Sequence, residues 1–240
     1  SSVSMKTKGH LYLIPCLLGD VAPMMVLPLA ISEAIESIDY YVVEHEKTAR
    51  RFIKSVVPHK SQDSLNLQSI NKYTQPETIP DLLSPCHEGH DLGVISDAGC
   101  PGVADPGAAL VAEAHKQNIK VFPLVGPSSI LLALMGSGFN GQNFAFHGYL
   151  PIDQNERKLE LQRLERESLR QGQAQIFIET PYRNNQMLGA LKQILSEHTM
   201  VCVACDLTLP TQYIQSATIQ HWQKISVDLH KRPAIFIIQA

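Results

Sequence analysis

The stretch Val94–Gly107, VISDAGCPGVADPG, decides the fold of this chain. An apolar run over residues 91–96 predicts a buried strand, and a helical pattern runs from Ala108 to about Lys116. The loop between them is built from Asp97, Gly99, Pro101, Gly102, Asp105, Pro106 and Gly107. Glycine lets the backbone approach a ligand closely, and ligands of parallel sheets bind at the carboxyl ends of the strands. The stretch therefore favours a nucleotide-like ligand, with a purely structural turn as the alternative.

The end of this loop predicts a defined helix start. Asp105 has the side chain of a typical N-cap residue, and Pro106 suits the first helical position because its missing N–H is not needed there. We therefore expect Asp105 to cap the helix that begins at Pro106.

Strands and helices alternate on both sides of this stretch. Strands are predicted at residues 11–14, 40–43, 91–96 and 119–125, and helices at residues 27–35, 47–56, 108–116 and 130–135. This alternation is typical of a doubly wound parallel sheet. Pro15, Glu44, Asp97 and Ser128 follow predicted strands, where such sheets bind ligands. Residues 58–85 are polar and weakly patterned, and we expect little to anchor them.

A glycine-rich break at residues 136–141 predicts a domain boundary, which gives domains at residues 5–140 and 141–240. The second half begins with an apolar segment at residues 143–149. Helices are then predicted at residues 156–170 and 185–195, and strands at residues 174–178, 200–206 and 234–239. We therefore expect an α/β protein with a parallel, doubly wound first domain and a mixed second sheet.

The formal net charge of −3 argues against a protein whose whole surface clamps nucleic acid, but local basic patches remain. One candidate cluster holds Arg50, Arg51, Lys54, His59 and Lys60. A second cluster holds Arg157, Lys158, Arg163, Arg166 and Arg170, but glutamates are interleaved with it, which is typical of a solvated, ion-paired helix face. No apolar run approaches the roughly 18 residues of a membrane span, so we expect no membrane association.

The five cysteines are scattered and odd in number, which suits reduced thiols in a cytoplasmic protein. Cys202 and Cys205 have C-x-x-C spacing, but they lie in a predicted strand, where positions three apart face opposite sides. No second C-x-x-C pair completes a zinc site, and residues 87–90 lack the spacing of a zinc-binding helix. We therefore expect no metal.

Several motifs, in order along most of the chain, resemble the tetrapyrrole methylase superfamily of S-adenosylmethionine (SAM) methyltransferases. The similarity is strongest to its bacterial ribosomal RNA small subunit methyltransferase I branch. Residues 94–107 match that branch's V-S-D-A-G-x-P-x-x-x-D-P-G loop. Residues 39–50, 121–129, 144–151, 176–183 and 207–208 resemble its D-x-x-x-x-E-D-T-R-x-T-R, G-P-S, F-x-F-x-G-F-L-P, I-F-x-E-S-P-x-R and L-T segments.

The resemblance implies a two-domain α/β protein, commonly a homodimer, with S-adenosyl-L-methionine in the cleft between its domains. The branch methylates the 2′-hydroxyl of a cytidine in 16S ribosomal RNA, which makes the small ribosomal subunit an expected partner. Carried over by position, the SAM-binding residues are Pro15, Asp97, Ala98, Gly99, Val103, Ser128, Ser129, Leu207, Pro233 and Ala234. Backbone N–H groups at Ser128 and Ser129 suit a carboxylate such as that of the methionine part of SAM.

The expected catalytic residues are Glu44, Arg50, Glu179 and Arg183. Glu44 can orient or deprotonate the acceptor, or instead form a salt bridge with Arg50. Glu179 and Arg183 can bind substrate, or pair with each other across the turn.

The chain departs from the branch on the acceptor side. His45 and Lys47 replace an aspartate and an arginine, and Cys205, Asp206 and Leu209 replace three charged residues of an R-E-L-T-K segment. His45 is a candidate base because an imidazole titrates near neutrality, or else a surface residue. Residues 67–74 do not match the branch's Y-H-E-H-N-like segment.

Three alternatives remain open at this point. The acceptor can be a tetrapyrrole or another small molecule in place of RNA. A second reading is a relative that binds SAM without catalysis. The third, a nucleotide enzyme of similar topology, needs a phosphate-binding motif such as G-x-x-x-x-G-K-[ST], which the sequence does not contain.

Overall fold

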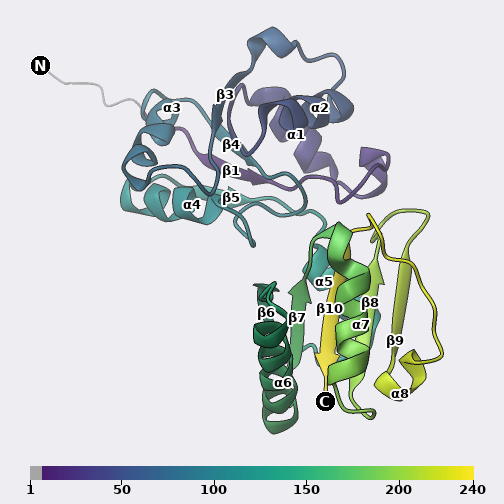
Figure 1. Ribbon diagram of the computed structural model, residues 1–240. Coiled ribbons are helices and arrows are strands. Elements are labelled where there is room, and N and C mark those ends of the chain that lie inside the picture. Colours follow the sequence, from purple (N-terminus) through teal and green to yellow (C-terminus); the bar gives the residue numbers. More distant parts are fainter. Residues whose placement is uncertain (1–6) are drawn as a thin grey trace, which may run out of the picture. The chain divides into compact units, whose positions relative to one another are not determined.

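The computed structural model describes residues 7–240, which divide into two compact units between Ser128 and Ser129 (Figure 1). The strands of the first unit are β1 (Leu11–Ile14), β2 (Tyr40–Val43), β3 (Asn66–Ser69), β4 (Leu92–Ile95) and β5 (Val121–Pro123). Its helices are α1 (Leu29–Ser37), α2 (Glu46–Val56), α3 (Ser84–His87) and α4 (Gly107–Lys116). The expected domain start at Met5 lies outside the described residues.

The five strands of the first unit form one sheet in the order β3-β2-β4-β1-β5, and every neighbouring pair is parallel. Ile31 of α1 and Phe52 of α2 pack on one face of the sheet with Tyr41, while Leu110 of α4 packs on the other face with Val42. Adjacent strand residues point to opposite faces, so the continuous apolar run of β2 is buried on both sides. The predicted doubly wound parallel sheet is confirmed.

The strand order places a topological switch point between β1 and β4. From β1 the chain moves through α1 toward β2, and from β4 it moves through α4 toward β5 in the opposite direction. The helices that follow two neighbouring strands therefore cover opposite faces, which leaves a crevice beyond the carboxyl ends of those strands. The loops at residues 15–28 and 96–106 begin at this point.

Residues 58–85 differ from the expectation of a weakly anchored segment. They contain β3, which pairs with β2 at the edge of the sheet, and three 3₁₀ turns at Gln62–Ser64, Pro76–Thr78 and Pro80–Leu83. Leu65, Ile70 and Leu83 are buried. A few well-placed apolar residues, rather than a periodic pattern, anchor this segment in the core.

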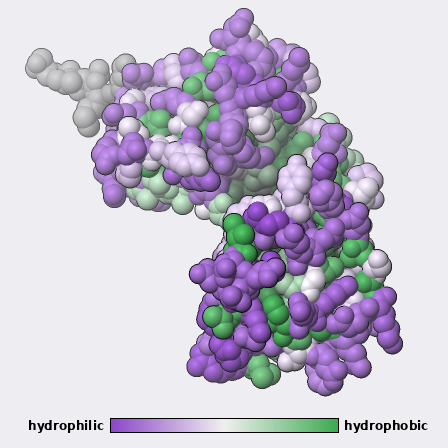
Figure 2. Space-filling view, in the orientation of Figure 1, coloured by the Kyte–Doolittle hydropathy of each residue, from purple (hydrophilic) through white to green (hydrophobic). Residues whose placement is uncertain are grey.

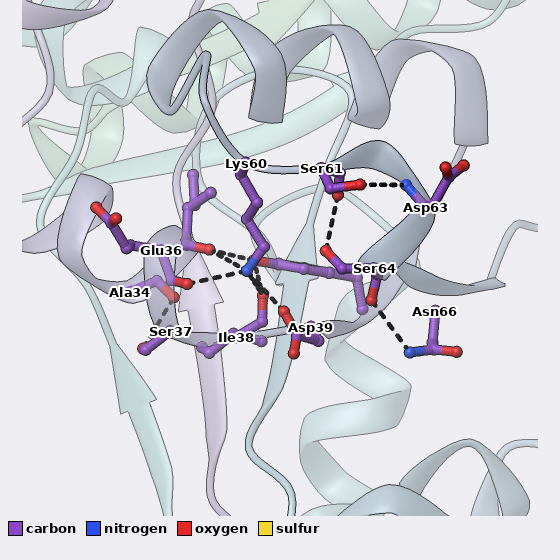
Figure 3. A network of polar contacts seen from close by, with 12 residues as sticks. Ala34, Glu36, Ser37, Ile38, Asp39, Lys60, Ser61, Asp63, Ser64 and Asn66 are labelled. Carbon is purple, nitrogen blue, oxygen red and sulfur yellow. Dashed lines mark hydrogen bonds and ion pairs between the residues drawn. The ribbon is translucent and has the colours of Figure 1, made fainter.

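Lys60 fixes the start of the same segment by reaching back under α1 (Figure 3). Its Nζ donates hydrogen bonds to the carbonyls of Ile35, Glu36 and Ile38, and it forms an ion pair with Asp39 at 2.8 Å. These carbonyls belong to the end of α1, which has no further helical N–H groups to offer them. Lys60 satisfies the end of α1 together with Tyr41, whose hydroxyl donates to the Ile38 carbonyl at 2.7 Å and to the Ile35 carbonyl at 3.3 Å.

The second unit is built on a mixed sheet with the order β6-β7-β10-β8-β9, in which only β6 and β7 are parallel. Its strands are β6 (Phe144–Tyr149), β7 (Ala174–Ile178), β8 (Met200–Cys205), β9 (Tyr213–Thr218) and β10 (Ala234–Gln239). Its helices are α5 (Ser129–Ser137), α6 (Gln154–Gln171), α7 (Asn184–Ile194) and α8 (Ile219–Trp222). The mixed second sheet is as predicted, while β9 and α8 are not anticipated by the sequence pattern.

The two units divide between Ser128 and Ser129, before the boundary expected at residue 140, because helix α5 belongs to the second unit. This helix packs against β8, β9 and β10, and the Ser216 hydroxyl donates a hydrogen bond to the Ser137 carbonyl at 2.7 Å. Helices α6, α7 and α8 share a separate core cluster with Phe177, Val203 and Phe236. The glycine-rich break therefore follows an element of the second unit and does not separate the units.

Hydrophilic residues cover most of the drawn face of each unit, with hydrophobic residues scattered among them (Figure 2). Among residues 7–240, no helix combines the length and apolar composition that a membrane crossing requires.

Candidate functional site

The loops that follow β1 and β4 are tied together at the switch point. The backbone N–H of Cys16 donates to the carbonyl of Gly99 at 2.9 Å, and the hydroxyl of Ser96 donates to the same carbonyl at 3.1 Å. Gly126 lies so close to Pro15 that a Cβ atom there would meet the Pro15 Cβ at 2.1 Å. The chain after β5 therefore packs directly on the chain after β1.

The loop after β4 depends on glycine at two positions. Gly99 has a φ of +68° and Gly102 a φ of +83°, values that L side chains rarely adopt. Asp105 holds the loop from inside, since its Oδ1 accepts hydrogen bonds from the N–H groups of Gly102 at 2.7 Å and Gly107 at 2.9 Å. Burial, followed by the nearby charge of Asp97, raises the pKa of this carboxyl above its usual range.

The expected helix start is wrong by one residue. Helix α4 begins at Gly107 and Pro106 is the N-cap, so Asp105 lies before the cap. Its carboxylate still binds the first helical N–H group, and its second bond is to the loop. Asp105 thus organises the loop as well as the helix start.

Asp97 connects the carboxyl ends of β2 and β4. Its backbone N–H donates to Oε1 of Glu44 at 3.1 Å, and its Oδ2 lies 2.7 Å from Nδ1 of His45. Burial raises the pKa of Glu44, and the negative charges of Asp97 and Asp105 raise it further, against the hydrogen bond from Asp97. The two strand ends therefore present a half-buried carboxyl group with a raised proton affinity beside an imidazole and a second carboxylate.

Arg50 does not pair with Glu44, so the alternative of a Glu44–Arg50 salt bridge is not found. Its Nε donates to Glu46 at 3.0 Å and its Nη1 donates to the carbonyl of Gln62 at 2.9 Å. These contacts tie α2 to the segment before β3. Arg50 is half-buried and its contacts are structural.

Two cavities border the loop after β4. The larger, of about 670 Å³, is lined by residues 16–23, Thr48, Arg51, Phe52, Ser55, Asp97 and Ala98. The smaller, of about 370 Å³, is lined by Leu13, Pro15, residues 100–103, Ala108, Val111, Pro123 and Leu124. Of the expected SAM-binding residues of this unit, Asp97 and Ala98 line the larger cavity and Pro15 and Val103 line the smaller, whereas Gly99 and Ser128 line neither. Residues 17–23, which form one wall of the larger cavity, are not among the site residues expected from the sequence. They could have been found because they directly follow β1, and ligands of parallel sheets bind at strand ends.

Ser128 ends the first unit and Ser129 begins α5 in the second. The other expected SAM-binding residues of the second unit lie together. The backbone N–H of Asp206 donates to the carbonyl of Pro233 at 3.0 Å, which places the end of β8 beside the start of β10. Leu207 and Ala234 are each 7% exposed. The neighbouring ion pair between Asp206 and Arg232, at 2.8 Å, is not anticipated by the sequence.

Glu179 and Arg183 pair with each other across the turn after β7, with Nη2 of Arg183 3.1 Å from Oε1 of Glu179. The same carboxylate oxygen accepts the N–H of Thr180 at 2.7 Å. The Glu179 side chain is only 2% exposed, while that of Arg183 is 35% exposed. Of the two, Arg183 has the surface needed to contact a substrate.

Across residues 7–240, no group of three or more His, Cys, Asp or Glu side chains is arranged to hold a metal ion. Cys205 belongs to the core cluster under α6 and α7, whereas Cys202 is buried outside that cluster. The two thiols of the C-x-x-C pair are separated by the sheet, as strand geometry predicts.

No protein-family model matches the chain. Curated proteins are similar over nearly its whole length. The ribosomal RNA small subunit methyltransferase I of Leptospira borgpetersenii serovar Hardjo-bovis is 30% identical over 96% of this chain and 88% of its own. The protein of the same name from Escherichia coli O157:H7 is 26% identical over 97% of this chain and 78% of its own.

Solved structures share the fold. The methyltransferase CobJ superimposes with a TM-score of 0.63 at 17% identity, covering 96% of this chain and 94% of its own. The uroporphyrin-III-C-methyltransferase of Thermus thermophilus gives a TM-score of 0.57 at 14% identity, covering 96% and 92%.

Proposed function

The chain belongs to the ribosomal RNA small subunit methyltransferase I family, and we propose that it methylates a ribose 2′-hydroxyl of the small-subunit ribosomal RNA. The protein is a methyltransferase whose methyl donor is S-adenosyl-L-methionine. The observation that carries the proposal is the loop after β4, which borders two cavities at the switch point of a parallel sheet.

The residues at this loop fit the donor. Cavities of about 670 and 370 Å³ lie within the range of roughly 300–1,000 Å³ usual for cofactor sites. A Cβ atom added to Gly102 would have no atom within 4 Å, so backbone there is open to a bulky ligand. We assign the donor contacts of the first unit to Pro15, Asp97, Ala98, Gly99, Val103 and Ser128. In the second unit we assign them to Ser129, Leu207, Pro233 and Ala234.

SAM supplies an electrophilic methyl group when bound. With the donor held by these contacts, the Glu44 carboxylate would accept the proton of the ribose hydroxyl as this oxygen takes up the methyl group and the sulfur leaves as a thioether. Oε1 of Glu44 is oriented by the Asp97 N–H, and its Oε2 has no hydrogen-bond partner within residues 7–240. Burial raises the pKa of Glu44, which makes it a stronger base than an exposed glutamate. Positioning supplies much of the acceleration of such a displacement.

Arg183 is the proposed contact for RNA phosphate. It pairs with Glu179, but 35% of its side-chain surface is still exposed. Arg50 stays in the proposed catalytic set: its bonds to Glu46 and Gln62 hold α2 in place, and its side chain is 33% exposed, nearly as much as that of Arg183.

We also propose that the protein works as a homodimer in the cytoplasm. Met24, Met25 and Leu29 are 93%, 75% and 72% exposed, and apolar side chains gathered in one short segment are typical of a surface that a second subunit covers. Light scattering of the purified protein tests the dimer, and a monomer at all concentrations would contradict it.

Methyl transfer to small ribosomal subunits that lack the modification tests the proposed reaction. With SAM labelled in its methyl group, we expect label in RNA that survives nuclease digestion as a 2′-O-methylated nucleoside. Glu44→Gln should abolish the signal. Label on a base, or on an added tetrapyrrole in place of RNA, would overturn the proposed acceptor.

A further inference from the structure

The basic residues around α2 separate into two groups in the structure. Arg50, His59 and Lys60 are held by contacts to Glu46, Glu36 and Asp39 respectively. Lys60 points inward under α1 (Figure 3). In contrast, Lys47, Arg51 and Lys54 are exposed and have no hydrogen bond or ion pair within residues 7–240. Only this second group, which we call the α2 stripe, is free to bind an external anion.

The α2 stripe has the geometry of a continuous binding edge. Its residues are spaced four and three apart, which places them on one face of the helix. At a rise of about 1.5 Å per residue, the stripe extends about 10 Å along the axis. That length exceeds one phosphate group, so the stripe suits a polyanion rather than a single small anion.

The α2 stripe also borders the larger cavity. Arg51 lines the cavity, together with Thr48 and Ser55 on the same helix. The loop that carries Asp97 and Ala98 forms another part of the wall. Asp20 lines the cavity too, so the attraction for an anion belongs to the stripe and not to the cavity as a whole.

The surrounding charges favour Arg51 as the anchor. The carboxylate nearest to Arg51 in sequence, Glu46, pairs with Arg50, and Asp97, which lines the same cavity as Arg51, contacts His45. A guanidinium with free N–H groups binds phosphate through two parallel hydrogen bonds. Because the whole chain carries a net charge of −3, a local basic stripe orients an approaching polyanion toward this edge.

We propose that Arg51, flanked by Lys47 and Lys54, binds backbone phosphates of the RNA strand next to the acceptor nucleotide. This nucleotide enters the larger cavity on the side lined by α2, while the wall formed by Asp97 and Ala98 contacts the donor. The inference rests on the proposed function, since it names the surface that holds the RNA acceptor. Phosphate contacts of this kind fix the register of a nucleic acid without reading its sequence.

The double variant Arg51→Gln/Lys54→Gln tests the α2 stripe, and Lys158→Gln/Arg166→Gln on α6 is the matched control. Both remove two exposed cations, and the control pair lies outside the residues that line either cavity. Binding of labelled small ribosomal subunits is measured over a series of salt concentrations. We expect about tenfold weaker binding at low salt for the α2 variant, and a slope of log K against log salt smaller by about 1 to 2. The control should keep the wild-type slope.

Two further readouts isolate RNA contact from other effects. Calorimetric SAM affinity and the melting temperature should be unchanged in both double variants, and methyl transfer should show a raised KM with an unchanged kcat. A wild-type salt slope and KM in the α2 variant would overturn the proposal. Subunit binding that depends on the stripe, with no methyl transferred by the wild-type protein, would support the α2 stripe and contradict only the proposed function.

Discussion

Nδ1 of His45 lies 2.7 Å from Oδ2 of Asp97, and this hydrogen bond joins the ends of β2 and β4 at the wall of the larger cavity. The related methyltransferase segment has an aspartate where this chain has His45. Two carboxylates so close together would repel each other, whereas the imidazole holds Asp97 in place. His45 therefore gives Asp97 a hydrogen-bond partner at a position where an aspartate would repel it.

We expect His45→Ala to weaken SAM binding several-fold, because a freed Asp97 side chain loses roughly 0.5–1.5 kcal/mol of rotamer entropy when it is ordered again by the ligand. Stability should hardly change, since the two side chains are 68% and 42% exposed. Calorimetry and thermal melting measure the two effects. His198→Ala, which removes the exposed contact to Glu197, is the control. Unchanged affinity would show that His45 does not position Asp97.

Glu44→Gln should stabilise the protein increasingly as the pH rises. Burial raises the pKa of Glu44 in the folded state, so the fold favours the protonated carboxyl over the carboxylate. The stability that the raised pKa of Glu44 contributes is fully present below the pKa of this group in the unfolded chain. It is lost as the pH rises through the pKa of the group in the folded protein. The amide of glutamine is neutral and keeps an oxygen for the Asp97 N–H. Melting temperatures from about pH 4 to about pH 8 measure the trend, and a constant difference would contradict it.

Lys60→Met should cost about 2–4 kcal/mol of the free energy of unfolding, because the carbonyls at the end of α1 lose a charged donor. The Lys60 side chain is 8% exposed and Asp39 is 51% exposed, so most of the effect comes from the carbonyls rather than from the ion pair. Lys54→Met, at an exposed position without a partner, should change stability by less than about 0.5 kcal/mol. Urea denaturation compares the two, and equal midpoints would refute this role of Lys60.

Gly126→Ala should destabilise the first unit by about 1–3 kcal/mol and weaken SAM binding. The added Cβ would lie 2.1 Å from the Cβ of Pro15, so the loop after β1 must move. Gly141→Ala is a suitable control because nothing lies within 4 Å of its added Cβ. Denaturation and calorimetry on both variants test the close approach, and wild-type values for Gly126→Ala would rule it out.

The sequence predicts the parallel sheet well because its central strands leave strong local signals. β1, β2 and β4 are short apolar runs buried on both faces, and they are followed by Pro15, by Glu44 and by the pair Ser96–Asp97 respectively. The edge strands are different. β3 (NLQS) and β9 (YIQSAT) carry polar residues and gain their structure from the neighbouring strand, which a local pattern does not reveal.

The candidate site follows the same division. Strand ends place Pro15, Glu44 and Asp97 at one edge of the sheet, and this grouping is predictable from topology alone. Contacts between individual side chains that lie far apart in the sequence are not predictable in this way. Sequence spacing pairs Arg50 with Glu44, whereas the helix places it one turn from Glu46 and beside Gln62. Likewise, nothing local indicates that Asp97 contacts His45.

Titration of SAM into the protein, with Asp97→Ala as the comparison, tests the account most directly. The loop after β4 is the proposed donor site, so we expect saturable calorimetric binding by the wild-type protein and at least tenfold weaker binding by the variant, about 1.4 kcal/mol or more. The variant should melt at the wild-type temperature, because the Asp97 side chain is 42% exposed. Equal affinity of the two proteins, with both folded, would contradict the assignment of this loop as the donor site.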